Sequence, residues 1–127
     1  ADRSKSIWIV TTAALPWMTG TAVNPLLRAA YMTQGRAAAG GKVTLMLPWL
    51  EDMEDQKRVY GQTVFADQSE QEEYVRTWLR ETATMKQESV DLNIAWYPAQ
   101  QIPQENSIYS MGDITAMINA EEADIII

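Results

Sequence analysis

The 127-residue sequence contains no cysteine and no histidine. Without cysteine the chain forms no disulfide bond, no thiolate metal site and no cysteine nucleophile. Without histidine it lacks the side chain that most often serves as general base or as metal ligand. An enzyme built on this chain must therefore use carboxylates, lysine or tyrosine, or take its catalytic residues from elsewhere.

Basic residues are also scarce: 10 Lys+Arg stand against 17 Asp+Glu, which gives a formal net charge of −7. Generic binders of nucleic acid or of anionic membranes need a basic field, so we expect no nucleic-acid partner. No segment approaches the ~20 apolar residues that span a bilayer, and the first six residues contain no apolar stretch of the signal-peptide type. Because 46% of the residues are apolar, we expect one globular domain at most.

The first 47 residues predict a strand, a helix and a second strand. The β-branched run from Ile7 to Thr12 is typical of a buried strand. Asn24 is a candidate N-cap, with Pro25 in the first turn of a helix that runs to about Ala39 and stops at Gly40-Gly41. Residues 42–47 form the next strand, closed by Pro48, and such a unit predicts a right-handed parallel crossover.

The remaining chain predicts further helices and strands. In chain order these are an acidic surface turn or short helix (51–60), a possible short strand (63–66), an amphipathic helix (69–85) with Ser69 and Glu72 as a capping box, a strand near a sheet edge (90–97), a loop (98–106), a short helix (113–120) and a strand that starts at Asp124. Together they predict an α/β fold with a Rossmann-like open parallel sheet and helices on both faces. We expect the chain to end within its last strand.

The loop from Pro16 to Asn24 is the main candidate for a binding site. It follows a strand and precedes a helix, where α/β proteins place ligands, although Gly20 alone is not a dinucleotide or phosphate-loop fingerprint. The backbone N–H groups and hydroxyls of Thr19-Gly20-Thr21 suit a sugar or phosphate, and Leu15, Trp17 and Met18 suit a lipid or membrane interface. The alternative is a packed surface turn in which Trp17 closes the end of the sheet.

The same loop carries a resemblance to a known family. The segment Leu15-Pro-Trp-Met-Thr-Gly-Thr-Ala-Val-Asn-Pro25 and its continuation to Tyr31 resemble the N-terminal part of the digalactosyldiacylglycerol synthases. These are galactolipid-making glycosyltransferases of plants and algae, similar to glycosyltransferase family 4, with the two-domain GT-B architecture. Weaker similarity continues, in order, through residues 43–50, 69–79, 94–98 and 121–125.

The resemblance implies transfer of galactose from UDP-galactose to the galactolipid acceptor monogalactosyldiacylglycerol, without a cofactor or a metal. Residues 1–127 would be an incomplete acceptor-side domain, with the UDP-sugar bound by an absent C-terminal donor domain and no catalytic residue in this chain. The implied substrate-binding residues are Pro16, Trp17, Thr19, Gly20, Thr21 and Asn24. It also implies peripheral attachment to the chloroplast envelope or another plastid membrane, and no activity for this segment alone.

Other interpretations stay open beside this one. A catalytically degenerate relative could serve as a structural or interaction subunit of a larger assembly, such as one in a photosynthetic membrane. The acidic segment Glu51-Asp-Met-Glu-Asp55 could be proposed as a metal site, but it lacks the glycine and terminal glutamate of an EF-hand loop, which favours a solvated turn. Trp49, Trp78 and Trp96 fall inside predicted elements and are expected to be core contacts.

Overall fold

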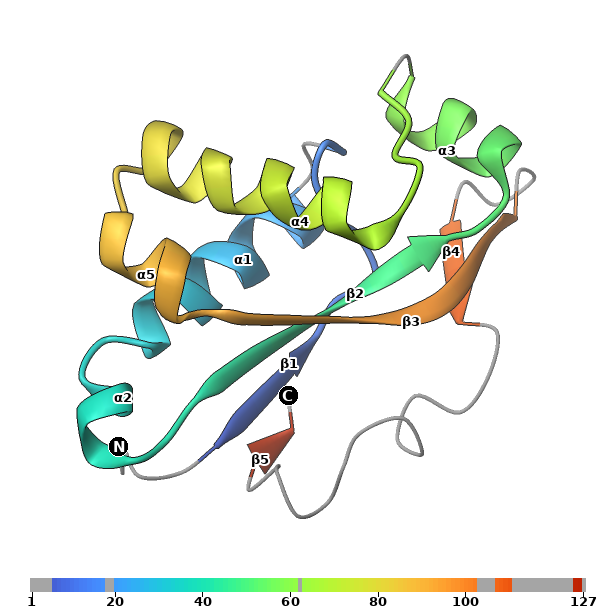
Figure 1. The fold of residues 1–127 in the computed structure, drawn as a ribbon. Helices are drawn as coiled ribbons and strands as arrows, with labels where there is room; N and C mark the ends of the chain where they lie inside the picture. The colour runs from blue at the N-terminus through green and yellow to red at the C-terminus, as the bar shows by residue number, and fades with distance from the viewer. Residues whose placement is uncertain (1–5, 18–19, 62, 103–106, 111–124, 127) are drawn as a thin grey trace.

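The computed structural model describes residues 6–17, 20–61, 63–102, 107–110 and 125–126. These residues form a five-stranded sheet of order β4-β3-β2-β1-β5, with helices packed above it (Figure 1). The strands are β1 (Ile7–Val10), β2 (Val43–Leu50), β3 (Asn93–Ile102), β4 (Ser107–Ser110) and β5 (Ile125–Ile126). Strands β5, β1, β2 and β3 are parallel, and β4 pairs antiparallel with β3. The predicted α/β class and Rossmann-like open parallel sheet are confirmed, and β4 adds an antiparallel edge that was not predicted.

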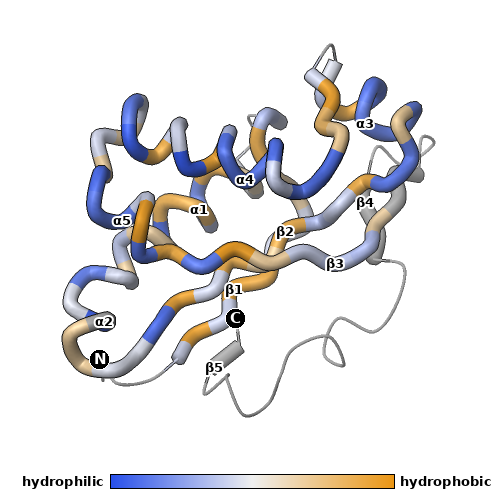
Figure 2. Tube along the Cα trace, viewed as in Figure 1, coloured by the Kyte–Doolittle hydropathy of each residue, from blue (hydrophilic) through white to orange (hydrophobic). Residues whose placement is uncertain are grey.

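One face of the sheet carries the larger hydrophobic core. The helices are α1 (Gly20–Met32), α2 (Arg36–Ala39), α3 (Met53–Tyr60), α4 (Gln68–Thr77), the π-helical segment η1 (Trp78–Thr82) and α5 (Lys86–Asp91). Apolar residues of α1, α4 and η1 bury Ile7, Ile9 and Leu45 on this face. Figure 2 shows the consequence along the chain: α1 is mostly hydrophobic in colour, whereas α4 alternates because only one of its sides meets the core.

The opposite face carries a second, smaller cluster. Trp8, Met46 and Tyr97 belong to it, and Val59 and Tyr60 of α3 pack against it. Strands buried on both faces read as continuous apolar runs, which explains the composition of Ile7–Val10. The helix predicted at 113–120, which would have tested the expectation of helices on both faces, lies outside the described residues.

Helix α1 begins at Gly20, five residues before the predicted start, so the prediction of Asn24 as N-cap is wrong. Pro25 lies inside the helix. As the sixth residue of the helix, Pro25 has no N–H for the carbonyl four residues earlier, so the cost is one helical hydrogen bond near the start of α1. The predicted continuous helix to Ala39 is interrupted by a turn, in which the Thr33 hydroxyl donates to the Ala30 carbonyl at 2.6 Å. The predicted stop at glycine is confirmed, since Gly40 follows α2 with a φ of 88°.

Strand β2 continues past Pro48 to Leu50, so the prediction that Pro48 closes it is wrong. The register explains why the proline is tolerated. Ile7 N–H donates to the Lys42 carbonyl at 2.9 Å and Thr11 N–H to the Met46 carbonyl at 3.1 Å, so the next bond of the ladder would run from residue 48 to the Thr11 carbonyl. Proline cannot make that bond. The hydroxyl of Tyr97 donates to the Thr11 carbonyl instead, at 2.7 Å.

The segment before α4 is not the short strand predicted at 63–66. The Gln56 side chain holds it, accepting from Phe65 N–H at 2.7 Å and donating to the Leu50 carbonyl at 2.8 Å. Helix α4 is capped by Asp67, which accepts from Glu70 N–H at 3.0 Å, and the predicted cap at Ser69 is wrong. The helical run ends with η1 at Thr82, three residues before the predicted end.

The third strand also differs from the prediction. Val90 belongs to α5 and not to a strand, because α5 occupies Lys86–Asp91. Strand β3 then passes through Pro98 to Ile102, into the predicted loop. Pairing with β4 begins only at Ala99, one residue after the proline. Pairing of Ile125 with Ile7 confirms a strand in the predicted C-terminal position.

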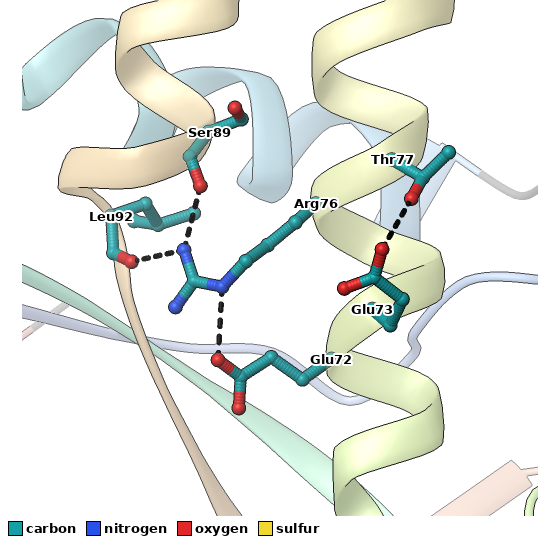
Figure 3. A network of polar contacts seen from close by, with 6 residues as sticks. All are labelled: Glu72, Glu73, Arg76, Thr77, Ser89 and Leu92. Atoms are coloured by element: carbon teal, nitrogen blue, oxygen red, sulfur yellow. Dashed lines mark hydrogen bonds and ion pairs between the residues drawn. The ribbon is translucent and has the colours of Figure 1, made fainter.

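Arg76 joins α4 to the start of β3 (Figure 3). Its guanidinium donates to the backbone carbonyls of Ser89 at 2.7 Å and Leu92 at 2.8 Å, and to the Glu72 carboxylate at 2.9 Å. Carbonyls at the end of α5 have no helical partner of their own, and charged donors satisfy them well. This contact fixes the sheet-facing side of α4 against the rest of the molecule.

Candidate substrate loop after the first strand

The candidate loop leaves the sheet at a point where the strand order reverses. Strand β1 lies between β2 and β5, so the chain moves to one side after β1 and returns on the other side at β5. In open α/β sheets such a switch point opens a crevice outside the carboxyl ends of the strands, and ligands bind there. The structure therefore places the segment that follows β1 where this fold provides a binding site (Figure 1).

Local hydrogen bonds shape the start of the loop. The Thr11 hydroxyl donates to the Ala13 carbonyl at 2.9 Å and accepts from Ala13 N–H at 3.3 Å. Trp17 N–H donates to the Ala14 carbonyl at 3.0 Å and closes a turn. The two contacts of the Thr11 side chain are typical of threonine turns, in which the hydroxyl bonds to backbone groups of a nearby residue.

A buried polar network fixes the loop from below. Gln71 of α4 is fully buried, and its side-chain amide donates to the Leu15 carbonyl at 3.0 Å. The amide oxygen of Gln71 accepts from the Trp96 indole N–H, also at 3.0 Å. One side chain thus joins the loop, α4 and β3. Sequence reasoning missed Gln71, although its spacing of four and eight residues from the buried Val75 and Leu79 places it on the inner side of the helix.

A buried tyrosine of α3, Tyr60, lies close to Gln71 of this network. The Tyr60 hydroxyl is buried and makes no hydrogen bond within the described part of the chain. Burial raises the pKa of Tyr60 to about 12, against a smaller opposing effect of the neighbouring Gln71 amide. Burial likewise raises the pKa of Tyr97 to about 12, and the proximity of Tyr60 adds to the shift.

The predicted site residues divide between loop and helix. Pro16 and Trp17 lie half-buried in the loop, whereas Gly20 is the exposed first residue of α1 and Asn24 is exposed one turn further on. Thr21 belongs to the same first turn, and Thr19 lies outside the described residues. The expectation of one continuous loop to Asn24 is therefore wrong, because helix α1 already begins at Gly20.

The apolar surface expected from the loop is smaller than predicted. Leu15 is 1% exposed and belongs to the larger core, so it offers nothing to a lipid. Trp17 packs against both hydrophobic clusters and is only partly accessible. Trp17 packs at the end of the sheet, as the alternative interpretation expects, and a role of its exposed part in binding stays a prediction. Met18 lies outside the described residues.

Gly20 does not need the conformational freedom of glycine. Its φ is not among the positive values found at Gly35, Gly40 and Gly61. A Cβ added at Gly20 would meet the Asn24 side-chain nitrogen at 3.5 Å, an ordinary contact distance. A side chain at this position would therefore point away from the protein core, and its effect would fall on whatever approaches the helix N-terminus.

The chemistry available at this N-terminus is binding, not proton transfer. The first turn of α1 contains no acidic residue, so no carboxylate of that turn offsets the positive end of the helix dipole. Such a terminus suits a phosphate or a hydroxyl-rich group. None of Pro16, Trp17, Gly20 and Asn24 ionises near neutral pH, so these residues could orient a substrate but could not act as general acid or base.

The acidic segment at 51–55 is engaged in helix α3. Asp52 caps the helix by accepting from Glu54 N–H at 2.9 Å, and Glu54 pairs with Lys57 at 3.4 Å. Asp55 is buried and pairs with Arg58. Among the described residues no three acidic side chains are grouped in a way that could hold a metal ion. Trp78 and Trp96 pack against the larger core, as predicted.

Comparison with known proteins gives a consistent set of relatives. No protein-family profile matches the chain. Digalactosyldiacylglycerol synthase 1, chloroplastic, is 44% identical over 127 residues in Arabidopsis thaliana and 46% identical over 127 residues in Glycine max. Digalactosyldiacylglycerol synthase 2, chloroplastic, of Arabidopsis thaliana is 43% identical over 125 residues. These matches cover 98–99% of the chain but only 15% of the first two relatives and 25% of the third.

In the part of the chain that the structure describes, no helix is long and apolar enough to cross a membrane.

Proposed function

Because this chain belongs by sequence to the digalactosyldiacylglycerol synthase family, we propose that it forms the acceptor-side part of a galactolipid galactosyltransferase. The reaction would move galactose from UDP-galactose to monogalactosyldiacylglycerol and give digalactosyldiacylglycerol. The chain spans about 15–25% of the length of these relatives, so the donor half of the site would come from sequence beyond it.

One observation carries the proposal. The segment with the most specific resemblance to the family, from Leu15 to Pro25, follows β1 at the switch point of the sheet and forms the N-terminus of α1. The resemblance of this segment to the family and its place in the fold both support the proposal.

The residues present would bind and orient substrate. Free N–H groups at Gly20 and Thr21 would donate hydrogen bonds to sugar hydroxyls or to a phosphate, and Asn24 would add a neutral donor and acceptor one turn further on. The exposed part of Trp17 would contact an apolar or sugar-ring surface. Proton transfer would rest on groups outside this loop.

The relatives are named as chloroplastic, in agreement with the plastid localisation predicted from the sequence. We propose peripheral attachment at the envelope or another plastid membrane, since the acceptor is a lipid. The net charge of −7 argues that attachment does not depend on a basic surface of this segment.

The test is Gly20→Val in the full-length enzyme. Valine forms helices at least as well as glycine, and the first Cβ position is free, so the fold should be retained. Added bulk at the helix N-terminus should displace the substrate and lower turnover by about tenfold or more. Ala38→Val is the matched control, because Ala38 is exposed on α2 at the opposite end of β2.

Turnover and circular dichroism of both variants separate the outcomes. Wild-type turnover of Gly20→Val would mean that this N-terminus does not approach the substrate, and loss of the fold would assign the residue a structural role. A full-length wild-type protein that makes no digalactolipid from UDP-galactose would favour the alternative, a scaffold without catalysis.

A further inference from the structure

A second candidate site lies along the outer side of α4 and η1. A groove of about 480 Å³ follows this side for its whole length. Its lining residues are Phe65, Glu70, Glu73, Tyr74, Thr77, Trp78, Glu81 and Thr82. Apart from Phe65, these residues recur every three to four positions and so form one continuous stripe of the helix.

The floor of the groove is aromatic and fixed in place. The ring of Tyr74 meets the edge of the buried Phe65 ring at a centroid distance of 5.8 Å and an interplanar angle of 68°. Tyr74 and Trp78 are half-buried and pack against the larger core. The groove therefore offers aromatic surface that is held by the core and does not need to be ordered on binding.

The rim is acidic. Glu70, Glu73 and Glu81 are exposed, and no basic residue is among the described residues that line the groove. Glu70 accepts from Ala66 N–H at 2.7 Å, and Glu73 accepts from the Thr77 hydroxyl at 3.2 Å. Arg80 approaches Glu81 only to 4.0 Å. Within the described ranges, Glu70 and Glu73 thus contact neutral donors, and Glu81 has one cation at the limit of ion-pair distance.

The spacing of the carboxylates selects the kind of ligand. Glu70 and Glu81 are eleven residues apart, which corresponds to about 16 Å along a helix. One ammonium head group of a lipid cannot approach both, whereas basic side chains along a peptide can. The π-helical segment that carries Trp78 and Glu81 is consistent with a binding role, because single π turns occur frequently at functional sites.

We propose that this groove binds a basic segment of a partner protein. Arginine or lysine side chains of that segment pair with Glu70, Glu73 and Glu81. Their stems and guanidinium planes lie over Tyr74 and Trp78, where cation–π attraction and apolar burial add to charge complementarity. This surface is separate from the candidate substrate residues, and the proposal holds whether or not the galactosyltransferase function does.

The test uses an acetylated and amidated peptide of alternating arginine and alanine, titrated into the isotopically labelled chain. Amide and indole NMR shifts should change in a saturable way at residues of α4 and η1, and affinity should fall as salt is raised. The double variant Glu73→Gln/Glu81→Gln should weaken binding by about tenfold, since it removes two charge pairs and keeps the shape.

The matched control is Glu51→Gln/Glu54→Gln, which removes the same two charges from exposed positions on and beside α3. Its affinity for the peptide should stay within about twofold of the wild type. Equal weakening by both double variants would reduce the effect to net charge and overturn the proposal. Saturable shifts in the groove with methyl galactoside, and none with the peptide, would overturn it in favour of a sugar site.

Discussion

Helix α4 presents one side to the sheet and α5 and another to the groove, and the two sides treat polar groups differently. Toward the sheet and α5, Gln71 and Arg76 use their side chains to satisfy backbone carbonyls and the Trp96 indole. Toward the groove, Glu73 accepts a hydrogen bond from the Thr77 hydroxyl on its own helix. Figure 3 shows Arg76 and Glu73 on different sides of α4.

The difference separates residues that determine the structure from residues that are free to bind. A buried polar group without a partner costs the full desolvation penalty, so pairing is strongly favoured for the polar groups on the sheet side. Exposed carboxylates remain hydrated and add little to stability. Polar residues on the sheet side should therefore govern unfolding, and those on the groove side should govern association.

The largest expected effect comes from alkaline pH, which acts on two buried tyrosines at the smaller hydrophobic cluster. Phenols in an unfolded chain ionise near pH 10, whereas burial raises the pKa of Tyr60 and of Tyr97 to about 12. The free energy of unfolding should be unaffected by these groups below about pH 10 and should fall by about 2 kcal/mol per tyrosine between about pH 10 and 12. Urea unfolding across this range measures it, and Tyr60→Phe should remove more than half of the loss, because Tyr60 also raises the pKa of Tyr97.

Gln71→Met should have the next largest effect. Methionine keeps the volume but leaves the Leu15 carbonyl and the Trp96 indole N–H without their partner, which predicts a loss of about 3 kcal/mol. Urea unfolding at neutral pH measures the change. Crystallography or NMR should show displacement at Leu15 and Pro16. A loss below about 0.5 kcal/mol would mean that water replaces the amide at no cost, and the contrast between the two sides would fail.

Replacing each of the two tyrosines by phenylalanine should change the stability of the fold by different amounts. Tyr97→Phe removes the hydrogen bond from the phenol to the Thr11 carbonyl, which Pro48 has no N–H to replace, and should destabilise the fold by about 1–2 kcal/mol. Tyr60→Phe removes a buried hydroxyl that has no partner in the described part of the chain, and should be neutral or stabilising at pH 7. Equal losses in thermal unfolding would indicate that the Tyr60 hydroxyl is paired after all.

The smallest effect is expected on the groove side. Glu73→Gln removes an exposed charge and keeps the ability to accept from Thr77, so the free energy of unfolding should change by less than about 0.5 kcal/mol. Urea unfolding beside Gln71→Met measures both sides of one helix under the same conditions. A loss as large as that of Gln71→Met would show that the groove carboxylate is structural.

The sequence predicted the fold class well because apolar β-branched runs and an amphipathic helix are local signals. Its boundaries failed most often at proline. The sequence pattern predicts an element boundary at Pro25, Pro48 and Pro98, and all three lie inside an element. Each is tolerated for a reason that depends on helix position or strand pairing: Pro25 lies near a helix start, Pro48 beyond the paired part of β1, and Pro98 just before the pairing with β4.

The candidate site was predictable only in part. Gly20 and Asn24 are exposed at the switch point, as a strand–loop–helix pattern suggests. The burial of Leu15 and the role of Gln71 depend on contacts between residues 56 positions apart, and no local pattern reports such a contact. The placement of Trp17 against two cores likewise requires the assembled sheet.

Pro48 has a consequence for how β2 finds its partner. Neighbouring strands rich in isoleucine, valine and leucine could pair in several alignments, because these side chains are similar in size and polarity. If β1 advanced by two residues along β2, the missing N–H of Pro48 would fall between paired residues and the Thr11 carbonyl would lose its match with the Tyr97 hydroxyl. The proline and the tyrosine together favour the observed alignment of the two strands over this shifted one. The alignment in turn sets where the loop after β1 begins.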